Sequence, residues 1–221
     1  MCDEVFEMQR KTTLLLIRHA NTESNALHKF QGRQDSELSE VGIRQAVLLG
    51  NALKDIPISA VYTSPLRRAK KTAELAFAGR VPVIVDDALS ARNFGILDGV
   101  TRDDAIKITE NAVEFYHGLI DDVDVEGVES LAELQERSLA VLKRITSENK
   151  GETIALITHV FWIKGVLCRL QGLKLADLRG RIGNTSITAI RVIHNGNGFE
   201  YSVEKIGEKG HLTGLRDKQI F

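Results

Sequence analysis

Apolar runs of strand length alternate with stretches of helical period along this chain. This alternation is typical of an α/β protein with a parallel or mostly parallel sheet. We expect one strand in each apolar run, near residues 13–18, 59–63, 82–85, 153–158, 186–193 and 199–205. No repeat, low-complexity tract or Pro/Gly-rich linker divides the sequence. We therefore expect a single domain over residues 1–221, with 1–12 as an N-terminal extension.

The helical stretches carry start signals. Ser39 is a good N-cap for the helix that follows the first expected strand. Pro65 lies near the start of the next helix, which carries Arg68 in its first turn. Ser130 can cap a third helix with apolar residues at helical spacing. Another helix is expected around residues 101–118.

Composition narrows the classes of function. Twenty-nine Lys and Arg face thirty Asp and Glu, so nothing global points to a nucleic acid or an anionic membrane. The two cysteines, Cys2 and Cys168, lie far apart and outside any metal-like spacing, which predicts neither a disulfide nor a zinc site. The apolar stretch near the N-terminus is interrupted by Arg18 and is too short for a signal peptide or a membrane span. We expect a soluble protein of the reducing cytoplasm.

Two histidines follow expected strands directly. His19 comes after Leu14-Leu15-Leu16-Ile17-Arg18, and His159 comes after the run that ends at Thr158. In open α/β sheets, ligands gather at the carboxyl ends of strands. A neutral imidazole can attack phosphorus and form a phosphoenzyme, while a second imidazole, as a cation, stabilises the developing charge. The pair therefore predicts phosphoryl transfer.

A transferring phosphoryl group carries negative charge on its equatorial oxygens and needs several cationic donors around it. Arg18 adjoins His19, and Arg68 follows the turn Thr63-Ser64-Pro65. Arg67, the neighbour of Arg68, is interpreted as a solvated helix residue. No His/Cys/carboxylate cluster has ligand spacing, so we predict a reaction that needs no metal and no cofactor.

Six segments together resemble the histidine phosphatase superfamily, which has the phosphoglycerate mutase-like fold. They are, in order, LLLIRHANTESN, FQGRQDSELSEVGIRQA, YTSPLRRAKKTA, LSARNFGILDG, ITHVFWIKGVL and GNTSI. The resemblance implies a three-layer α/β/α sandwich with a mostly parallel central sheet. It also implies that His19 is the phosphorylated nucleophile. The other residues that it places at the site are Arg18, Arg68 and His159 around the phosphate, Asn25 beside the nucleophile, and Gln31 with Gly32 in the loop over the substrate.

One position departs from the family pattern. The family's LxE element supplies a glutamate that protonates the leaving oxygen and later activates water, and here Ala91 occupies its place in Leu89-Ser90-Ala91. An alanine methyl cannot transfer a proton, so general acid–base help worth about 10²- to 10⁴-fold is missing. Two origins are open: a Glu-to-Ala substitution made to trap a complex, or a natural variant. Asp86, Asp87 and Asp98 are nearby carboxylates in sequence.

Three functions fit these observations. The first is a phosphatase that hydrolyses a small phosphomonoester through phospho-His19. The second is a mutase, which returns the phosphoryl group to bound product and excludes water. Cofactor-dependent mutases of the family carry an insertion between the LxE element and the second histidine. This chain has only about sixty residues between Phe94 and Thr158, which favours the phosphatase. The third is a phosphate-binding or regulatory protein without turnover, for which Ala91 is the best argument.

The expected partner is a small phosphomonoester, with phosphate or sulfate able to occupy the pocket. The substrate itself is open, and so is the oligomeric state, with a homodimer as the candidate assembly. The Phe161-Trp162-Ile163 cluster follows His159, and two uses are open for it: facing the substrate, or core packing, which is the expected one. The remaining histidines are expected to be surface or structural residues: His28, His117, His194 and His211.

Overall fold

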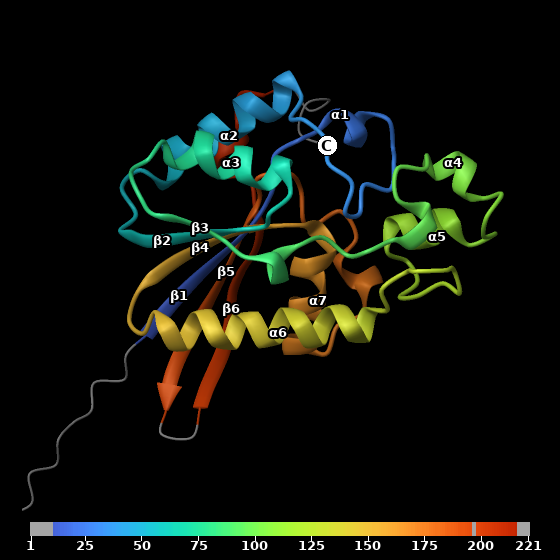
Figure 1. Cartoon of the computed structure of the whole chain (residues 1–221). Helices are drawn as coiled ribbons and strands as arrows, with labels where there is room; N and C mark the ends of the chain where they lie inside the picture. The colour runs from blue at the N-terminus through green and yellow to red at the C-terminus, as the bar shows by residue number, and fades with distance from the viewer. Residues whose placement is uncertain (1–10, 196–197, 216–221) are drawn as a thin grey trace, which may run out of the picture.

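The computed structural model describes residues 11–195 and 198–215, and a six-stranded sheet in the order β3-β2-β4-β1-β5-β6 forms its centre (Figure 1). The strands are β1 (Lys11–Arg18), β2 (Ile58–Thr63), β3 (Val83–Val85), β4 (Thr153–Thr158), β5 (Ile187–Asn195) and β6 (Gly198–Glu208). Strands β1 to β4 are parallel, whereas β5 runs antiparallel to both of its neighbours. The prediction of a mostly parallel sheet is confirmed.

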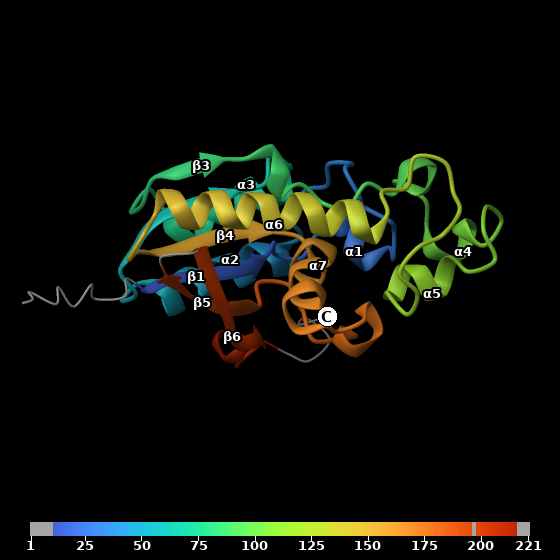
Figure 2. The ribbon, with the colours of Figure 1, turned by 90° about the horizontal axis from the view of Figure 1, so that it is seen from below.

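Helices cover both faces of this sheet. They are α1 (Glu23–Ala26), α2 (Glu40–Leu53), α3 (Arg67–Phe77), α4 (Arg102–Ala105), α5 (Ala112–His117), α6 (Leu131–Glu148) and α7 (Val160–Gln171). Helices α2 and α3 lie on one face, and α6 and α7 lie on the other (Figures 1 and 2). The short helices α4 and α5 lie beyond the sheet, at the end of α6. The three-layer arrangement expected from the resemblance is confirmed.

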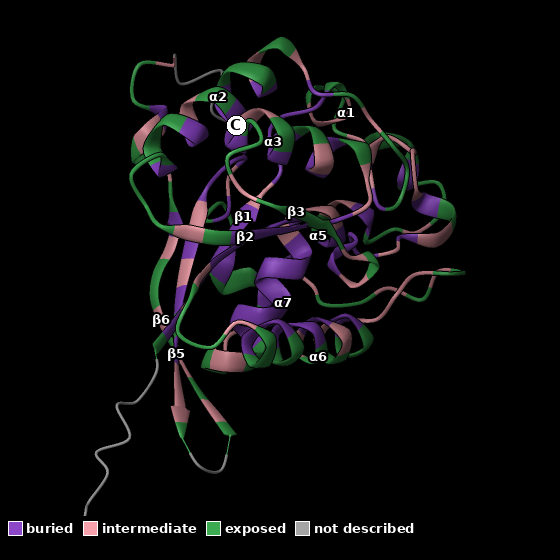
Figure 3. Cartoon of the chain, turned by 60° about the vertical axis from the view of Figure 1, so that its left-hand side comes forward, coloured by how far each residue is buried: buried purple, intermediate pink, exposed green. Residues whose placement is uncertain are grey.

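Alternate positions of the strands feed two separate cores, because successive side chains of a strand point to opposite faces. Leu14 and Leu16 of β1 belong to the core under α6 and α7. Leu15 and Ile17 belong to the core under α2 and α3. Helix α7 is buried over most of its surface, while α6 keeps an exposed outer face (Figure 3). The sheet is therefore packed against helices on both sides.

The expected helix starts at Ser39 and Ser130 are present. The Ser39 hydroxyl accepts a hydrogen bond from the Gly42 N–H at 3.1 Å. Ser130 and Glu133 form a reciprocal capping box at the start of α6. Each cap satisfies backbone N–H groups that have no partner within the helix.

The single helix expected over residues 101–118 is wrong. Two short helices, α4 and α5, replace it, and Thr101 caps the first of them. The intervening residues include the β-branched Ile106, Ile108 and Thr109, which lose side-chain freedom in a helix. The carbonyl of Thr109 accepts the N–H of Ala112 in a tight turn instead. This break gives the segment a bent path past the end of the sheet.

Two further expectations concern the N-terminus. Most of the expected extension, with Cys2, lies outside the described residues, and Lys11 and Thr12 already belong to β1, so the extension is shorter than predicted. Within the described residues, no helix has the length and apolar content needed to cross a membrane. Cys168 is a buried free thiol.

Candidate active site

A cavity of about 310 Å³ opens at the carboxyl ends of β1 and β4. It lies where the sequence placed the ligand site, because parallel strands end at the same edge of the sheet. The cavity brings together the residues expected from the sequence, namely Arg18, His19, Asn25, Gln31, Gly32, Arg68, Ala91 and His159. They come from segments far apart in the chain, which the sheet register aligns.

His19 follows β1 directly and is buried. Its ring Nδ1 lies 2.7 Å from the carbonyl oxygen of Ala20, and a carbonyl can only accept, so Nδ1 carries the proton. Burial, the largest cause, and the charges of Arg68 and Arg18 hold the pKa of His19 well below its ordinary value of 6.5. The ring is therefore neutral at pH 7, and its Nε2 keeps a free lone pair for nucleophilic attack.

The backbone of His19 is fixed by a segment from the far end of the chain. The Asn184 side-chain amide donates to the His19 carbonyl at 2.9 Å. The Thr185 N–H donates to the Arg18 carbonyl at 3.0 Å, and Thr185 has a φ of 53°, an uncommon conformation for a β-branched residue. The His19 N–H donates to Thr158 of β4 at 2.9 Å. These contacts define the direction in which the imidazole leaves the strand.

His159 occupies the N-cap position of α7 and lies beside His19, with the two ring centroids 5.1 Å apart. An Arg68 guanidinium nitrogen lies 3.3 Å from Nδ1 of His159, and arginine can only donate, so Nδ1 accepts. The proton then sits on Nε2, which donates to the Ser64 hydroxyl at 2.9 Å. Both rings thus have a defined tautomer.

The protonation state of His159 differs from the expectation. Burial, followed by the charges of Arg68, His19 and Arg18, lowers the pKa of His159 well below 6.5. The protein's own charges therefore favour a neutral ring rather than the expected cation. The negative charge of a bound phosphate would oppose this shift.

Arg68 and Arg18 supply the fixed positive charge. Arg68 is 1% exposed and donates to the carbonyls of Gly32 and Gln34, both at 2.7 Å. Arg18 donates to the carbonyl of Ile182 at 2.9 Å. Among the described residues, the Nε atoms of both arginines lack a partner. Burial lowers the pKa of each to about 10, so both remain charged at pH 7. Two cations that line the cavity, the buried Arg68 and the half-buried Arg18, form a site for an oxyanion.

No carboxylate lies among the described residues that line the cavity. Ala91 is 5% exposed in its wall, and its carbonyl accepts from Arg137 at 3.0 Å. Asp98 accepts from the Arg33 N–H at 2.9 Å instead, and burial raises its pKa. Asp86 pairs with Arg144. The carboxylates that are close in sequence are thus bound elsewhere, and Ala91 has no replacement in the wall.

Asn25 and the 31–32 loop form one side of the cavity. The Asn25 side-chain oxygen accepts from the N–H of Thr22, and the Gln31 side-chain oxygen accepts from the Thr22 hydroxyl at 3.1 Å. Gly32 has a φ of 43°, and a Cβ there would lie only 1.6 Å from a carboxylate oxygen of Asp98. Glycine is therefore required at the point where the loop meets Arg68.

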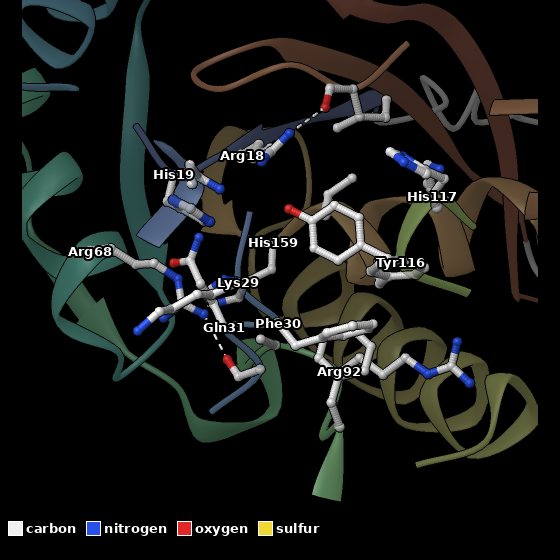
Figure 4. Close-up of a pocket in the computed structure, with 18 of the residues that line it drawn as sticks. Arg18, His19, Lys29, Phe30, Gln31, Arg68, Arg92, Tyr116, His117 and His159 are labelled. Carbon is white, nitrogen blue, oxygen red and sulfur yellow. Dashed lines mark hydrogen bonds between the residues drawn. The ribbon is translucent and has the colours of Figure 1, made fainter. Parts of the chain in front are cut away.

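The cavity has two ends with different residues (Figure 4). We call the set Arg18, His19, Arg68 and His159 the strand end. We call the set Tyr116, His117, Lys164 and Arg179 the outer end; all four line the cavity. The Tyr116 hydroxyl points from the outer end toward the strand end, and burial raises the pKa of Tyr116, so it keeps its proton.

The residues of the outer end were not predicted. His117, expected to be a surface or structural residue, lines the cavity. Phe161 also lines the cavity, although it is buried in the core as expected, like Trp162 and Ile163. One sequence signal was available. Lys164 is the only charged residue in the run Val160-Phe161-Trp162-Ile163-Lys164-Gly165-Val166-Leu167, and a lysine in such a run requires an explanation.

The described residues contain no group of three or more His, Cys, Asp or Glu side chains that could hold a metal ion. The charge at the strand end is carried by arginines and imidazoles. The chemistry there can be described with these side chains alone.

The fold and the cavity together define an α/β protein with a buried basic oxyanion site at the carboxyl ends of parallel strands. Comparison with known families gives the class: the histidine phosphatase superfamily (branch 1) matches residues 14–204, and this chain belongs to that superfamily. The family and fold predicted from the sequence are therefore confirmed.

Individual relatives carry both phosphatase and mutase names. The chain is 34% identical over 203 residues to phosphoglycerate mutase-like protein 4 of Arabidopsis thaliana, covering 90% of this chain and 86% of that protein. It is 30% identical over 188 residues to metal-independent phosphoserine phosphatase of A. thaliana, covering 82% and 76%. The solved structure of Bacillus stearothermophilus YhfR has a TM-score of 0.80 and 31% identity, covering 91% of this chain and 99% of that chain. The superfamily is thus one of phosphoryl-transfer enzymes.

Proposed function

We propose that this protein is a phosphatase that hydrolyses a small phosphomonoester through a phosphohistidine on His19. The observation that carries this proposal is the tautomer of His19, whose Nδ1 proton is bound by the Ala20 carbonyl while Nε2 is free and neutral. The guanidinium groups of Arg18 and Arg68, which line the same cavity, support it as donors to the phosphoryl oxygens. The relative named a metal-independent phosphoserine phosphatase supports the hydrolytic outcome.

The reaction has two displacements at phosphorus. In the first, Nε2 of His19 forms an N–P bond while the ester P–O bond breaks, and the leaving oxygen takes a proton from water. In the second, water attacks phosphorus, the N–P bond breaks, and inorganic phosphate leaves while the released proton goes to solvent. Arg18 and Arg68 neutralise the charge of the oxyanion in both steps.

Ala91 determines which substrates react well. The cavity wall offers no carboxylate to protonate the leaving oxygen, so the first displacement depends on a leaving group that is stable as an anion. The second displacement also lacks a base for water. The phosphoenzyme should therefore form quickly with an aryl phosphate and then accumulate.

The same absence favours a second candidate function. A protein that holds the anion site without any general acid or base could bind a phosphate ester without turnover, as a regulatory protein. We place it second because the nucleophilic nitrogen of His19 is free and correctly ionised, which a binding protein does not need.

A pre-steady-state assay tests the proposal. The parent chain, Ala91→Glu and the matched control Ala91→Gln are mixed with 4-nitrophenyl phosphate, and phosphohistidine is measured as acid-labile label. We expect a burst and label in the parent chain and in Ala91→Gln. Ala91→Glu should turn over steadily, with a gain of about 10²- to 10⁴-fold on alkyl phosphates. If no form labels or hydrolyses while phosphate still binds, the regulatory function replaces the phosphatase.

A further inference from the structure

Lys164 is a nearly buried cation in the wall of the cavity. Val160, Phe161 and Lys164 all line the cavity because their spacing places them on one face of α7. The Lys164 residue is 4% exposed, and its ammonium lies 5.6 Å from the centroid of the Phe161 ring. Helix α7 thus delivers a positive charge into the cavity one turn and a half after His159.

The Lys164 ammonium lies at the outer end of the cavity. A Cβ on Gly118, the residue that ends α5, would lie 3.1 Å from Nζ of Lys164. His117 directly precedes Gly118, and its labelled side chain lies across the cavity from His19 (Figure 4). Arg179 also lines the cavity. Three basic side chains from α5, α7 and the loop after residue 178 therefore gather away from the histidine pair.

These basic groups have no acidic counterpart in the described part of the chain. Lys164 makes no ion pair or hydrogen bond with a residue of 11–195 or 198–215, and the cavity wall there contains no Asp or Glu. Burial, then the charge of Arg18, lowers the pKa of Lys164 to about 8. Burial also lowers the pKa of His117, and Arg179 and Lys164 add to that shift.

An unpaired buried cation is unfavourable for folding unless function requires it. The end of α5 supplies only a partial negative charge, and the Phe161 ring supplies a weak cation–π contact. Neither neutralises the charges of Lys164 and the neighbouring Arg179. An anion that enters the cavity would do so.

We propose that Lys164, with His117 and Arg179, binds a second anionic group, a carboxylate or a phosphate, on the leaving group of the substrate. This inference rests on the proposed function, because it assumes that the scissile phosphate lies at the strand end. Phe30, Phe94 and Tyr116 line the same cavity, so a short carbon chain between the two anions would contact apolar surface. The cavity volume of about 310 Å³ suits a compact substrate with two charged ends.

The test uses three esters on one three-carbon chain. Propyl phosphate ends in a methyl group, 3-(phosphonooxy)propanoate in a carboxylate, and propane-1,3-diyl bisphosphate in a second phosphate. Binding is measured by titration calorimetry in a His19→Ala background, where the proposed nucleophile is absent. We expect at least one charged ester to bind about tenfold more tightly than propyl phosphate, and the better of the two identifies the anion.

Two variants locate the preference. Lys164→Met keeps the length of the side chain and should remove most of the tenfold preference. Arg179 is exposed, so Arg179→Gln leaves the core intact and should reduce the preference about threefold. The matched control Lys143→Met lies on the exposed side of α6 and should leave the preference unchanged. Circular dichroism checks the fold of each variant.

The outcomes separate the two proposals. If all three esters bind equally, or if the preference survives both Lys164→Met and Arg179→Gln, the second anion site is wrong, whether or not the parent chain hydrolyses phosphate esters. If the preference is present and depends on Lys164 but the parent chain hydrolyses none of the three esters or 4-nitrophenyl phosphate, the site stands and the phosphatase proposal fails. If no ester binds, the second anion site is wrong, and the phosphatase proposal fails with it only when the parent chain also leaves 4-nitrophenyl phosphate intact.

Discussion

The two ends of the cavity differ in how the fold builds them. The residues of the strand end lie on or directly after β1 and β4 and at the start of α3. Within the sheet, Arg18 of β1 pairs with Thr158 of β4. The outer end lies mainly on short helices and loops beyond the sheet, and Arg179 is exposed there. The sheet thus fixes the groups proposed for chemistry, whereas segments outside the sheet shape the space proposed for the leaving group.

The supporting contacts differ in the same way. His19 is held by backbone hydrogen bonds from β4 and from Thr185. Helix α5 is held mainly through Phe115, which stacks on Phe30, and through Arg92, whose guanidinium lies 4.8 Å from the Phe115 ring. A change in the outer end should therefore alter selectivity or local stability and spare the strand end.

The largest effect is expected from His19→Ala. Removal of the nucleophilic nitrogen should abolish the acid-labile phosphoenzyme and reduce hydrolysis of 4-nitrophenyl phosphate by about 10⁴-fold or more. The exposed His28 provides the matched control, since His28→Asn lies outside the cavity and tolerates the positive φ of that position. If acid-labile label persisted in His19→Ala, the nucleophile would be another residue, and the strand end would not carry the chemistry proposed for it.

A smaller effect, on stability, is expected from Arg92→Met. The Arg92 guanidinium is fully buried and donates to the Glu129 and Asp121 carbonyls, both at 2.8 Å, and to the Asp122 carboxylate at 2.6 Å. Loss of these three bonds, one of them to a charged acceptor, should lower the free energy of unfolding by about 2–3 kcal/mol in urea titrations. Hydrogen exchange should rise most in residues 112–122.

The exposed pair of Arg102 with Asp103 serves as the control for this change, since surface ion pairs contribute about 0–1 kcal/mol. Arg102→Met should therefore leave unfolding nearly unchanged. If Arg92→Met reduced protection from hydrogen exchange in β1 and β4 as much as in residues 112–122, the two ends of the cavity would form one cooperative unit.

The smallest effect is a dependence of stability on pH. Burial lowers the pKa of His19 and His159 below 6.5, so below that pH the unfolded chain binds more protons than the folded chain. The free energy of unfolding should fall as the pH falls from 6.5 to 5.5, by about 1 kcal/mol for each ring. His19→Gln and His159→Gln should each reduce this slope in urea titrations, and an unchanged slope in the double variant would contradict the assignment.

The elements that could be predicted from the sequence are those that short-range signals decide. Strand β4 covers the predicted residues 153–158, because an uninterrupted apolar run is typical of a strand that is buried on both faces. Ser39 and Ser130 form the expected caps, since a cap depends on residues only three positions away. The strand end of the cavity followed from these elements, because parallel strands deliver their following residues to one edge.

The outer end could not be derived in the same way. Residues 101–118 carry helix-forming and β-branched residues together, and tertiary contacts decided where the helix breaks. Whether His117 faces solvent or the cavity depends on that break. The charge state of His159 also depends on burial and on Arg68, which lies 91 positions away in sequence.

The clamp formed by Asn184 and Thr185 on the backbone of His19 has a consequence for the order in which a new chain becomes active. The ribosome makes β1 and His19 near the beginning of synthesis. In the folded protein, however, β1 lies between β4 and β5, which are made much later. The backbone of Arg18 and His19 also binds Asn184 and Thr185, which are made near the end. A nascent chain that ends before Asn184 contains all four basic residues of the strand end. It lacks the hydrogen bonds from Asn184 and Thr185 that orient His19. We therefore expect competence for phosphoryl transfer to appear only after the segment that contains Asn184 and Thr185 has been added.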